Sequence, residues 1–173
     1  MNEPRLERGF FWNGDPMSRK NYDDFVNQLR DQVEEVMPWD VEEAFAGNYD
    51  GLVIDLREES EWNRCRIKGS FHVPRGVLEA AADWGYEESL QELIEAREKK
   101  VLLICRSGKR SVLAAHVLGL MGFEKPISLK TGIRGVWEAD FPLYDDRGEV
   151  DEEKLEPFFY PDPPPPSGPK NRA

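Results

Sequence analysis

Short apolar runs and stretches of helical spacing alternate along the middle of the chain. The runs predict buried strands, and the one at 101–104 is unbroken, as expected of a central parallel strand. The predicted strands are 52–55, 70–73, 101–104 and 127–129. The predicted helices are 40–45, 58–65, 76–84, 88–99, 111–121 and 132–138. Strands that alternate with helices predict an α/β fold, a doubly wound parallel sheet with helices on both faces.

The segment before this alternation predicts an amphipathic helix over residues 16–37, with Asp15 as its cap and Pro16 in its first turn. We expect this helix to pack on the domain, in preference to binding a partner. Its apolar face consists of the residues that recur at helical spacing, namely Tyr22, Phe25, Val26, Leu29, Val33 and Val36.

The end of the chain departs from the α/β pattern. Residues 145–173 begin acidic, and seven of the chain's 13 prolines lie between Pro157 and Pro169. Such a composition favours extended polyproline II and does not form a packed core. We therefore expect a solvated tail that lies along the domain through its aromatic residues; a docking site for a proline-reading module is the less favoured alternative. The expected organisation is an N-terminal extension (1–35), an α/β domain (36–144) and a proline-rich tail (145–173).

Charge and hydropathy limit the partners. Lysine and arginine number 23 against 34 acidic residues, and the net charge of -11 argues against nucleic acid or an anionic membrane surface. The longest apolar run, 112–123, is interrupted by His116 and is shorter than the ~20 residues of a membrane span. The opening residues lack the apolar core of a secretory signal, so we expect a cytoplasmic protein. No oligomeric state follows from these features.

One short segment is positively charged, in contrast to the negative net charge of the whole chain. Residues 105–111 read CRSGKRS and follow a predicted strand, where open α/β sheets bind ligands. A helix N-terminus and adjacent cations favour a thiolate, and the N–H groups of the loop would form an anion-binding nest around the sulfur. Cys105 is therefore the candidate nucleophile, in preference to a merely buried apolar residue. The candidate substrate-binding residues are Arg106, Ser107, Gly108, Lys109, Arg110 and Ser111.

Four motifs resemble the rhodanese family, specifically its single-domain thiosulfate sulfurtransferases. The loop CRSGKRS is similar to the family's active-site loop, and the resemblance covers residues 36–143. Cys65 stands where the family usually has glycine, and Arg66 where it often has histidine; neither lies in the loop. The other three motifs are Asp55-Leu-Arg-Glu58, Arg66-Ile-Lys-Gly-Ser-Phe-His-Val-Pro74 and Lys130-Thr-Gly-Ile-Arg-Gly-Val-Trp137.

The resemblance implies a rhodanese-like fold and sulfur transfer without a cofactor. Cys105 would attack the outer sulfur of thiosulfate, release sulfite and keep a persulfide. The acceptor would be cyanide, a thiol or a sulfur-carrier protein. Arg106 and Lys109 are expected to bind the sulfonate-like end of this small anionic donor, and Arg110 and the loop amides to stabilise the persulfide. Because pyruvate-type donors go with less basic loops in the family, thiosulfate is favoured.

Two other functions remain open. The first is a phosphatase or an arsenate reductase, since cell-cycle phosphatases share this fold. Their loop is Cys-x5-Arg, and its arginine binds the phosphate. Here Ser111 stands in the place of that arginine, and Arg110 comes one position early. A loop one residue shorter suits a sulfur atom better than a phosphoryl group. A non-catalytic binding or regulatory module is the second alternative, and the presence of Cys105 argues against it.

Three residues outside the loop carry weaker expectations. Asp55 ends a strand beside the loop and would bond its amides or, as we favour, have a structural role. Arg75 would line the mouth of the site with Trp84 or belong to a surface turn, and both interpretations stay open. Cys65 is more simply an incidental thiol than a resolving one. Neither histidine has metal-ligand spacing with a cysteine, so no metal site is expected.

Overall fold

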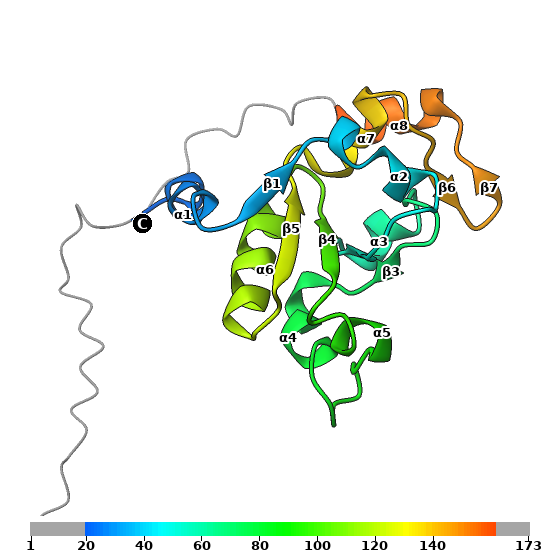
Figure 1. Ribbon diagram of the computed structural model, residues 1–173. Helices are drawn as coiled ribbons and strands as arrows, with labels where there is room; N and C mark the ends of the chain where they lie inside the picture. The colour runs from blue at the N-terminus through cyan, green and yellow to red at the C-terminus, as the bar shows by residue number, and fades with distance from the viewer. Residues whose placement is uncertain (1–19, 162–173) are drawn as a thin grey trace, which may run out of the picture.

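The structure is a computed structural model and describes residues 20–161. Its main feature is a parallel sheet in the order β1-β5-β4-β2-β3 (Figure 1). The central strand β4 carries the unbroken apolar run, and its carboxyl end leads directly into the CRSGKRS loop. The strands are β1 (Glu34–Val36), β2 (Leu52–Asp55), β3 (Phe71–His72), β4 (Lys100–Ile104) and β5 (Lys125–Leu129).

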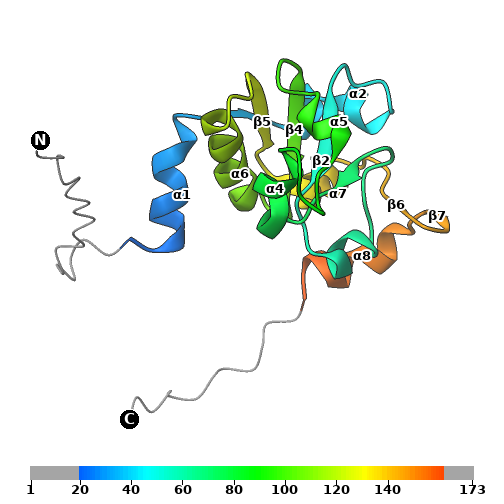
Figure 2. The same cartoon turned by 90° about the horizontal axis from the view of Figure 1, so that it is seen from below.

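Helices cover both faces of this sheet, which confirms the predicted fold class (Figures 1 and 2). Alternate residues of β4 face two separate apolar clusters, Leu102 and Ile104 in one, Val101 and Leu103 in the other. The expected helices at 76–84 and 88–99 are reduced to single turns beside a 3-10 turn at 75–77. The helices are α1 (Tyr22–Arg30), α2 (Glu42–Phe45), α3 (Glu59–Trp62), α4 (Leu78–Ala81), α5 (Gln91–Ile94), α6 (Lys109–Leu120), α7 (Gly132–Glu138) and α8 (Glu152–Phe159).

The prediction of one helix over residues 16–37 is wrong in its second half. Helix α1 ends at Arg30, and Glu34 to Val36 form β1, which pairs in parallel with β5 at the edge of the sheet. The β-branched Val33 and Val36 suit an extended strand as well as a helix face, and pairing with β5 decides between them. The cap of α1 is Asn21, whose side chain accepts a hydrogen bond from the Asp24 N–H at 2.9 Å. The predicted cap, Asp15, lies outside the described residues.

The prediction of a solvated tail without packed structure is wrong for residues 145–160, whereas the expected contact of its aromatic residues with the domain is confirmed at Phe159. Strands β6 (Tyr144–Asp145) and β7 (Gly148–Glu149) form an antiparallel hairpin, and α8 then packs on the domain. Leu155 and Phe159 are buried in the apolar cluster on the α7 face of the sheet. Burial of these side chains outweighs the acidic composition and the proline inside the helix, which together concealed its amphipathic pattern. The proline run at 163–166 lies outside the described residues.

Within residues 20–161, no helix combines the length and the apolar character that a membrane span requires.

Candidate active site

The candidate active site is the loop between the end of β4 and the start of α6. Cys105 is almost fully buried, and its Sγ accepts a hydrogen bond from the Gly108 N–H at 3.1 Å. The Ser111 hydroxyl lies 3.5 Å from the same sulfur and 2.8 Å from the Ser128 hydroxyl. The sulfur therefore faces polar hydrogen atoms of its own loop. Sequence reasoning missed Ser128, although a lone serine between Ile127 and Leu129 was a visible signal.

Helix α7 packs against the far side of this loop. The N–H of Ile133 bonds the carbonyl oxygen of Cys105 at 2.8 Å, and the N–H of Arg134 bonds that of Arg106 at 3.2 Å. The first N–H groups of a helix have no partner within the helix, so here they bind the loop. Two loop carbonyls are thereby satisfied by α7, and the loop amide of Gly108 stays with the sulfur.

Two glycines permit this close packing. Gly108 has φ +85°, and a Cβ there would lie 1.8 Å from the Lys130 carbonyl oxygen. Gly132 has φ +61°, and its Cβ would lie 2.4 Å from the Cys105 carbonyl oxygen. Both the left-handed backbone and the lack of space exclude any larger residue. Ser107, which precedes Gly108 in the loop, is partly exposed.

The three cations of the loop each have a partner. Arg110 donates to both carboxylate oxygens of Glu61, at 3.0 and 3.1 Å. Arg106 bonds the carbonyl oxygen of Phe158 in α8, and its guanidinium lies 4.5 Å from that ring's centre. Lys109 forms an ion pair with Asp23 in α1. Arg106 and Lys109 are thus held by α8 and α1, the helices that follow and precede the α/β pattern.

Asp55 belongs to a buried ion pair. Its carboxylate accepts from the Arg57 guanidinium at 2.7 Å and from the Arg57 backbone N–H at 3.0 Å. Arg57 in turn donates to the carbonyl oxygens of Glu61 and Cys65. Burial lowers the pKa of Arg57, but Asp55, Cys65 and Glu61 together raise it by more, so the guanidinium remains charged. These contacts give Asp55 a structural role in holding the segment that carries Glu61.

Two backbone hydrogen bonds connect Arg75, through Leu56, to the end of β4, just before the CRSGKRS loop. Its N–H bonds the Leu56 carbonyl at 3.0 Å, and the Leu56 N–H bonds the Ile104 carbonyl at 2.8 Å. Its side chain pairs with Glu79 at 2.9 Å. Arg75 therefore lies near the edge of the sheet that carries the loop, and its guanidinium is paired within its own helical turn.

Cys65 lies on the opposite face of the sheet from Cys105. Cys65 belongs to the apolar cluster with Leu102 and Ile104, whereas Cys105 belongs to the cluster with Leu103. Burial raises the pKa of the Cys65 thiol. Both observations favour an incidental thiol at this position. Across the described part of the chain, no cluster of three or more histidine, cysteine or acidic residues could hold a metal ion.

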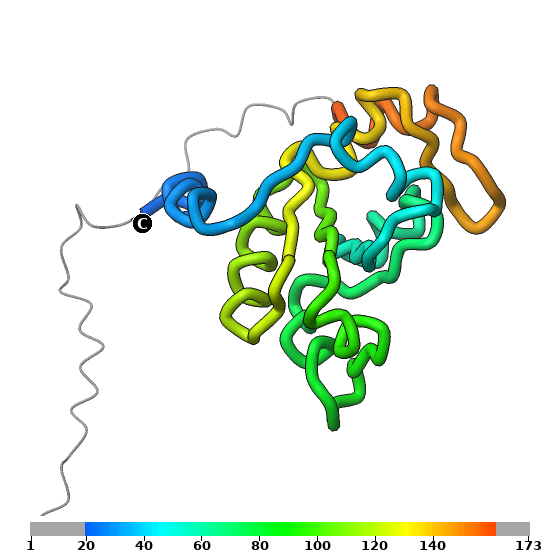
Figure 3. The backbone as a smooth tube through the Cα atoms, in the orientation of Figure 1, coloured from blue at the N-terminus to red at the C-terminus, as the bar shows by residue number. Residues whose placement is uncertain are grey.

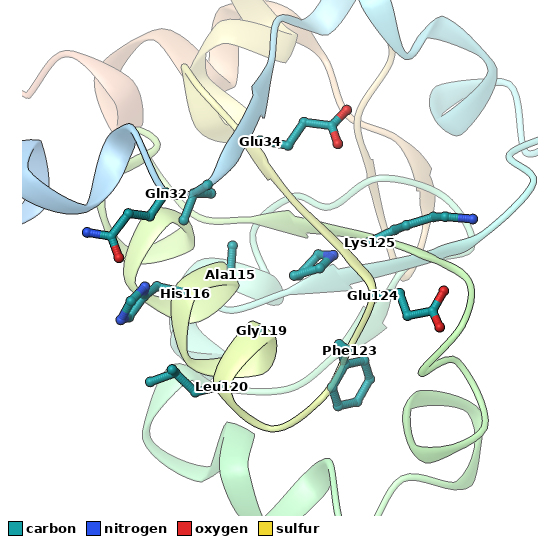
Figure 4. Close-up of a pocket in the computed structure, with 11 residues that line it drawn as sticks. Gln32, Glu34, Ala115, His116, Gly119, Leu120, Phe123, Glu124 and Lys125 are labelled. Atoms are coloured by element: carbon teal, nitrogen blue, oxygen red, sulfur yellow. The ribbon is translucent and has the colours of Figure 1, made fainter.

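A hollow of about 380 Å³ lies apart from the loop, between the start of β1 and the C-terminal half of α6 (Figure 4). Its walls include Gln32, Glu34, His116, Leu120 and Lys125, and none of its lining residues comes from 105–111. The hollow is therefore separate from the loop that carries Cys105.

The family model of the Rhodanese-like domain matches residues 40–139. The chain belongs to the rhodanese family. The resemblance stated from its sequence motifs is thus confirmed, and all four motifs lie within the match. Helices α1 and α8, which hold Lys109 and Arg106, lie outside the match.

Several relatives of this rhodanese carry functional names. A putative sulfur carrier protein of Bacillus subtilis is 35% identical over 47% of this chain and 39% of its own length. A putative mitochondrial thiosulfate sulfurtransferase of Schizosaccharomyces pombe is 29% identical over 53% of this chain and 71% of its own. The chain thus spans well under half of the Bacillus protein.

Solved structures agree on the fold. A protein of unknown function from Rhodopseudomonas palustris, described as a possible tyrosine phosphatase, superposes with a TM-score of 0.65 at 25% identity, over 72% of this chain and 94% of the other. The polysulfide-sulfur transferase of Wolinella succinogenes gives a TM-score of 0.55 at 24% identity, over 72% and 87% of the two chains.

Proposed function

We propose that this rhodanese transfers the outer sulfur of thiosulfate through a persulfide on Cys105. The contact of the Gly108 N–H with the Cys105 sulfur at 3.1 Å carries this proposal, because it supports a negative charge on that atom. The Ser111 hydroxyl beside the sulfur adds a second polar contact. Relatives named as sulfur carrier and thiosulfate sulfurtransferase support the same chemistry.

The reaction proceeds in two displacements. The Cys105 thiolate attacks the outer sulfur of thiosulfate; the sulfur–sulfur bond of the donor breaks, and sulfite leaves with its electron pair. The acceptor then attacks the terminal sulfur, and Cys105 leaves as a thiolate. Cyanide yields thiocyanate in this step, and a thiol, including a cysteine thiol of a sulfur-carrier protein, yields a persulfide. No cofactor takes part in either displacement.

The loop cations have separate roles in this scheme. Arg106 and Lys109 bind the sulfonate-like end of the donor, and Arg110 with the loop amides stabilises the persulfide. The donor must then compete for Arg106 with the Phe158 carbonyl and for Lys109 with Asp23. Arg110 is held by Glu61 in a fixed position.

The test is sulfur transfer from thiosulfate to cyanide by Cys105→Ser and by Cys65→Ala as the matched control. We expect Cys105→Ser to lose turnover and keep its fold by circular dichroism, and Cys65→Ala to keep turnover. Mass spectrometry after thiosulfate treatment should add one sulfur to the Cys105 peptide and none to the Cys65 peptide. Substantial turnover by Cys105→Ser contradicts the proposal.

Phosphatase chemistry is the alternative, since the Rhodopseudomonas structure is described as a possible tyrosine phosphatase. The loop argues against it, because Ser111 occupies the position of the phosphate-binding arginine and Arg110 is paired with Glu61. Hydrolysis of an aryl phosphate by the intact chain, lost in Cys105→Ser, would favour the phosphatase. Inactivity in both assays would favour a binding module.

A further inference from the structure

Helix α1 lies beside α6, and Figure 2 shows the two helices next to each other. The side chain of Val26 anchors this contact, because it is buried while its neighbours on α1 are exposed. The first turn of α1 thereby reaches the first turn of α6, where Lys109 follows the reactive loop. An element outside the family match thus forms part of the surroundings of the sulfur.

Two residues of α1 contact Lys109. The carboxylate of Asp23 forms an ion pair with its ammonium, and the ammonium lies 5.6 Å from the centre of the Tyr22 ring. Partial burial raises the pKa of Tyr22. Because Lys109 belongs to the CRSGKRS segment, its contacts with Tyr22 and Asp23 place α1 at the border of the candidate site.

We propose that Asp23 is a specificity-determining residue, which competes with anionic sulfur donors for the Lys109 ammonium. This inference rests on the proposed function and names what sets its donor preference. An anionic donor must displace the Asp23 carboxylate before it gains the full charge of Lys109, whereas a donor without a negative charge has no such competition. Glu61 holds Arg110 from inside the family core, but Asp23 acts from outside it.

The expected effect is modest, because the pair is half-exposed: the Lys109 side chain is 40% and the Asp23 side chain 62% exposed. Exposed ion pairs are worth up to about 1 kcal/mol, which is roughly a fivefold change in affinity. Removal of the Asp23 charge should therefore lower the KM for thiosulfate about two- to fivefold and leave kcat unchanged.

Asp24→Asn is the matched control for Asp23→Asn. Both aspartates lie in the first turn of α1, so both substitutions remove the same charge from the same helix end. Of these two aspartates, Asp23 alone pairs with Lys109. We expect Asp24→Asn to keep the wild-type KM. In a Lys109→Gln background, Asp23→Asn should no longer change the KM, because the group for which it competes is gone.

The inference fails if Asp23→Asn leaves the KM unchanged, if Asp24→Asn lowers it equally, or if the effect persists without Lys109. A binding measurement distinguishes failure of this inference from failure of the proposed sulfur transfer. Calorimetric titration of Cys105→Ser with thiosulfate should show two- to fivefold tighter binding once Asp23→Asn is added. If thiosulfate binds in this way but no protein transfers its sulfur, Asp23 has the proposed role and the transfer reaction is refuted. Equal binding by both proteins refutes the role of Asp23.

Discussion

The backbone N–H of Ile133 donates a hydrogen bond to the carbonyl oxygen of Cys105 at 2.8 Å. The residue proposed as the nucleophile is thereby fixed to a helix that starts almost 30 positions later in the chain. Gly132 makes the contact possible, because it brings the first turn of α7 against the loop without a side chain.

Gly132→Ala should therefore impair catalysis. Its Cβ would overlap the Cys105 carbonyl oxygen, and the residue would have to keep φ near +61°. Overlap and strain together should cost about 2–4 kcal/mol of unfolding free energy. A displaced loop should lower kcat about tenfold or more. The control is Gly119→Ala in α6, where a Cβ meets nothing within 4 Å; it should gain roughly 1 kcal/mol and keep its activity. Equal activity of the two variants would show that α7 does not fix the loop.

The buried pair of Asp55 and Arg57 predicts a large loss of stability in Asp55→Asn. Both side chains are inaccessible, so the variant leaves an uncompensated guanidinium in the interior, at a cost of about 3–5 kcal/mol. Glu79→Gln breaks the partly exposed pair with Arg75 and should cost less than ~1 kcal/mol. Urea unfolding followed by circular dichroism measures both. A similar small loss in both variants would mean that the Asp55 pair is not buried in solution.

Helix α8 should be part of the folded domain, and Leu155→Ala tests this. Leu155 is 1% exposed and lies in the apolar cluster on the α7 face of the sheet, so truncation of its side chain should cost about 2–5 kcal/mol of unfolding free energy. Glu156→Ala changes the adjacent, exposed residue and should be close to neutral. If Leu155→Ala is as stable as Glu156→Ala in thermal unfolding, α8 does not contribute to the core.

Tyr49 predicts a loss of stability in alkali. Burial, and next the charges of Glu43 and Glu34, raise the pKa of Tyr49 to about 12. Tyrosine in the unfolded chain titrates near 10, so the unfolded state ionises first. The stabilisation from neutral Tyr49 is complete below pH ~10 and is lost as the pH rises towards 12.

Tyr49→Phe removes this titration and should unfold with a flatter pH dependence above pH ~9. Within residues 20–161 the Tyr49 hydroxyl has no hydrogen-bond partner, so the variant should be at least as stable as the wild type at neutral pH. Tyr86→Phe removes an exposed hydroxyl and serves as the control. Parallel pH profiles for wild type and Tyr49→Phe would contradict the raised pKa.

The sequence predicted those parts of the molecule whose cause is local. The apolar run of β4, the loop that follows it and the glycine at 108 are contiguous, and each was found. Strand β1 was mistaken for helix because its partner β5 lies some 90 residues away, and Val33 and Val36 stand at helical spacing although both are β-branched. Helix α8 was missed because Pro157 and the acidic residues around it outweighed Leu155 and Phe159 as local signals.

The surroundings of the site were harder to predict than the site. The cationic loop was visible as a motif, but the pairing of Arg106 with Phe158 and of Lys109 with Asp23 depends on how distant segments pack. The contact of Ser111 with Ser128 likewise joins α6 to β5. Such contacts depend on how segments distant in sequence pack together, and no local sequence pattern indicates them.

The stack of Trp137 on Phe159, with ring centres 5.3 Å apart, joins α7 to α8. Because the opposite end of α7 bonds the carbonyl oxygen of Cys105, two stacked rings and one short helix connect α8 to the residue that carries the sulfur. We therefore expect a displacement of α8 to disturb the position of Cys105.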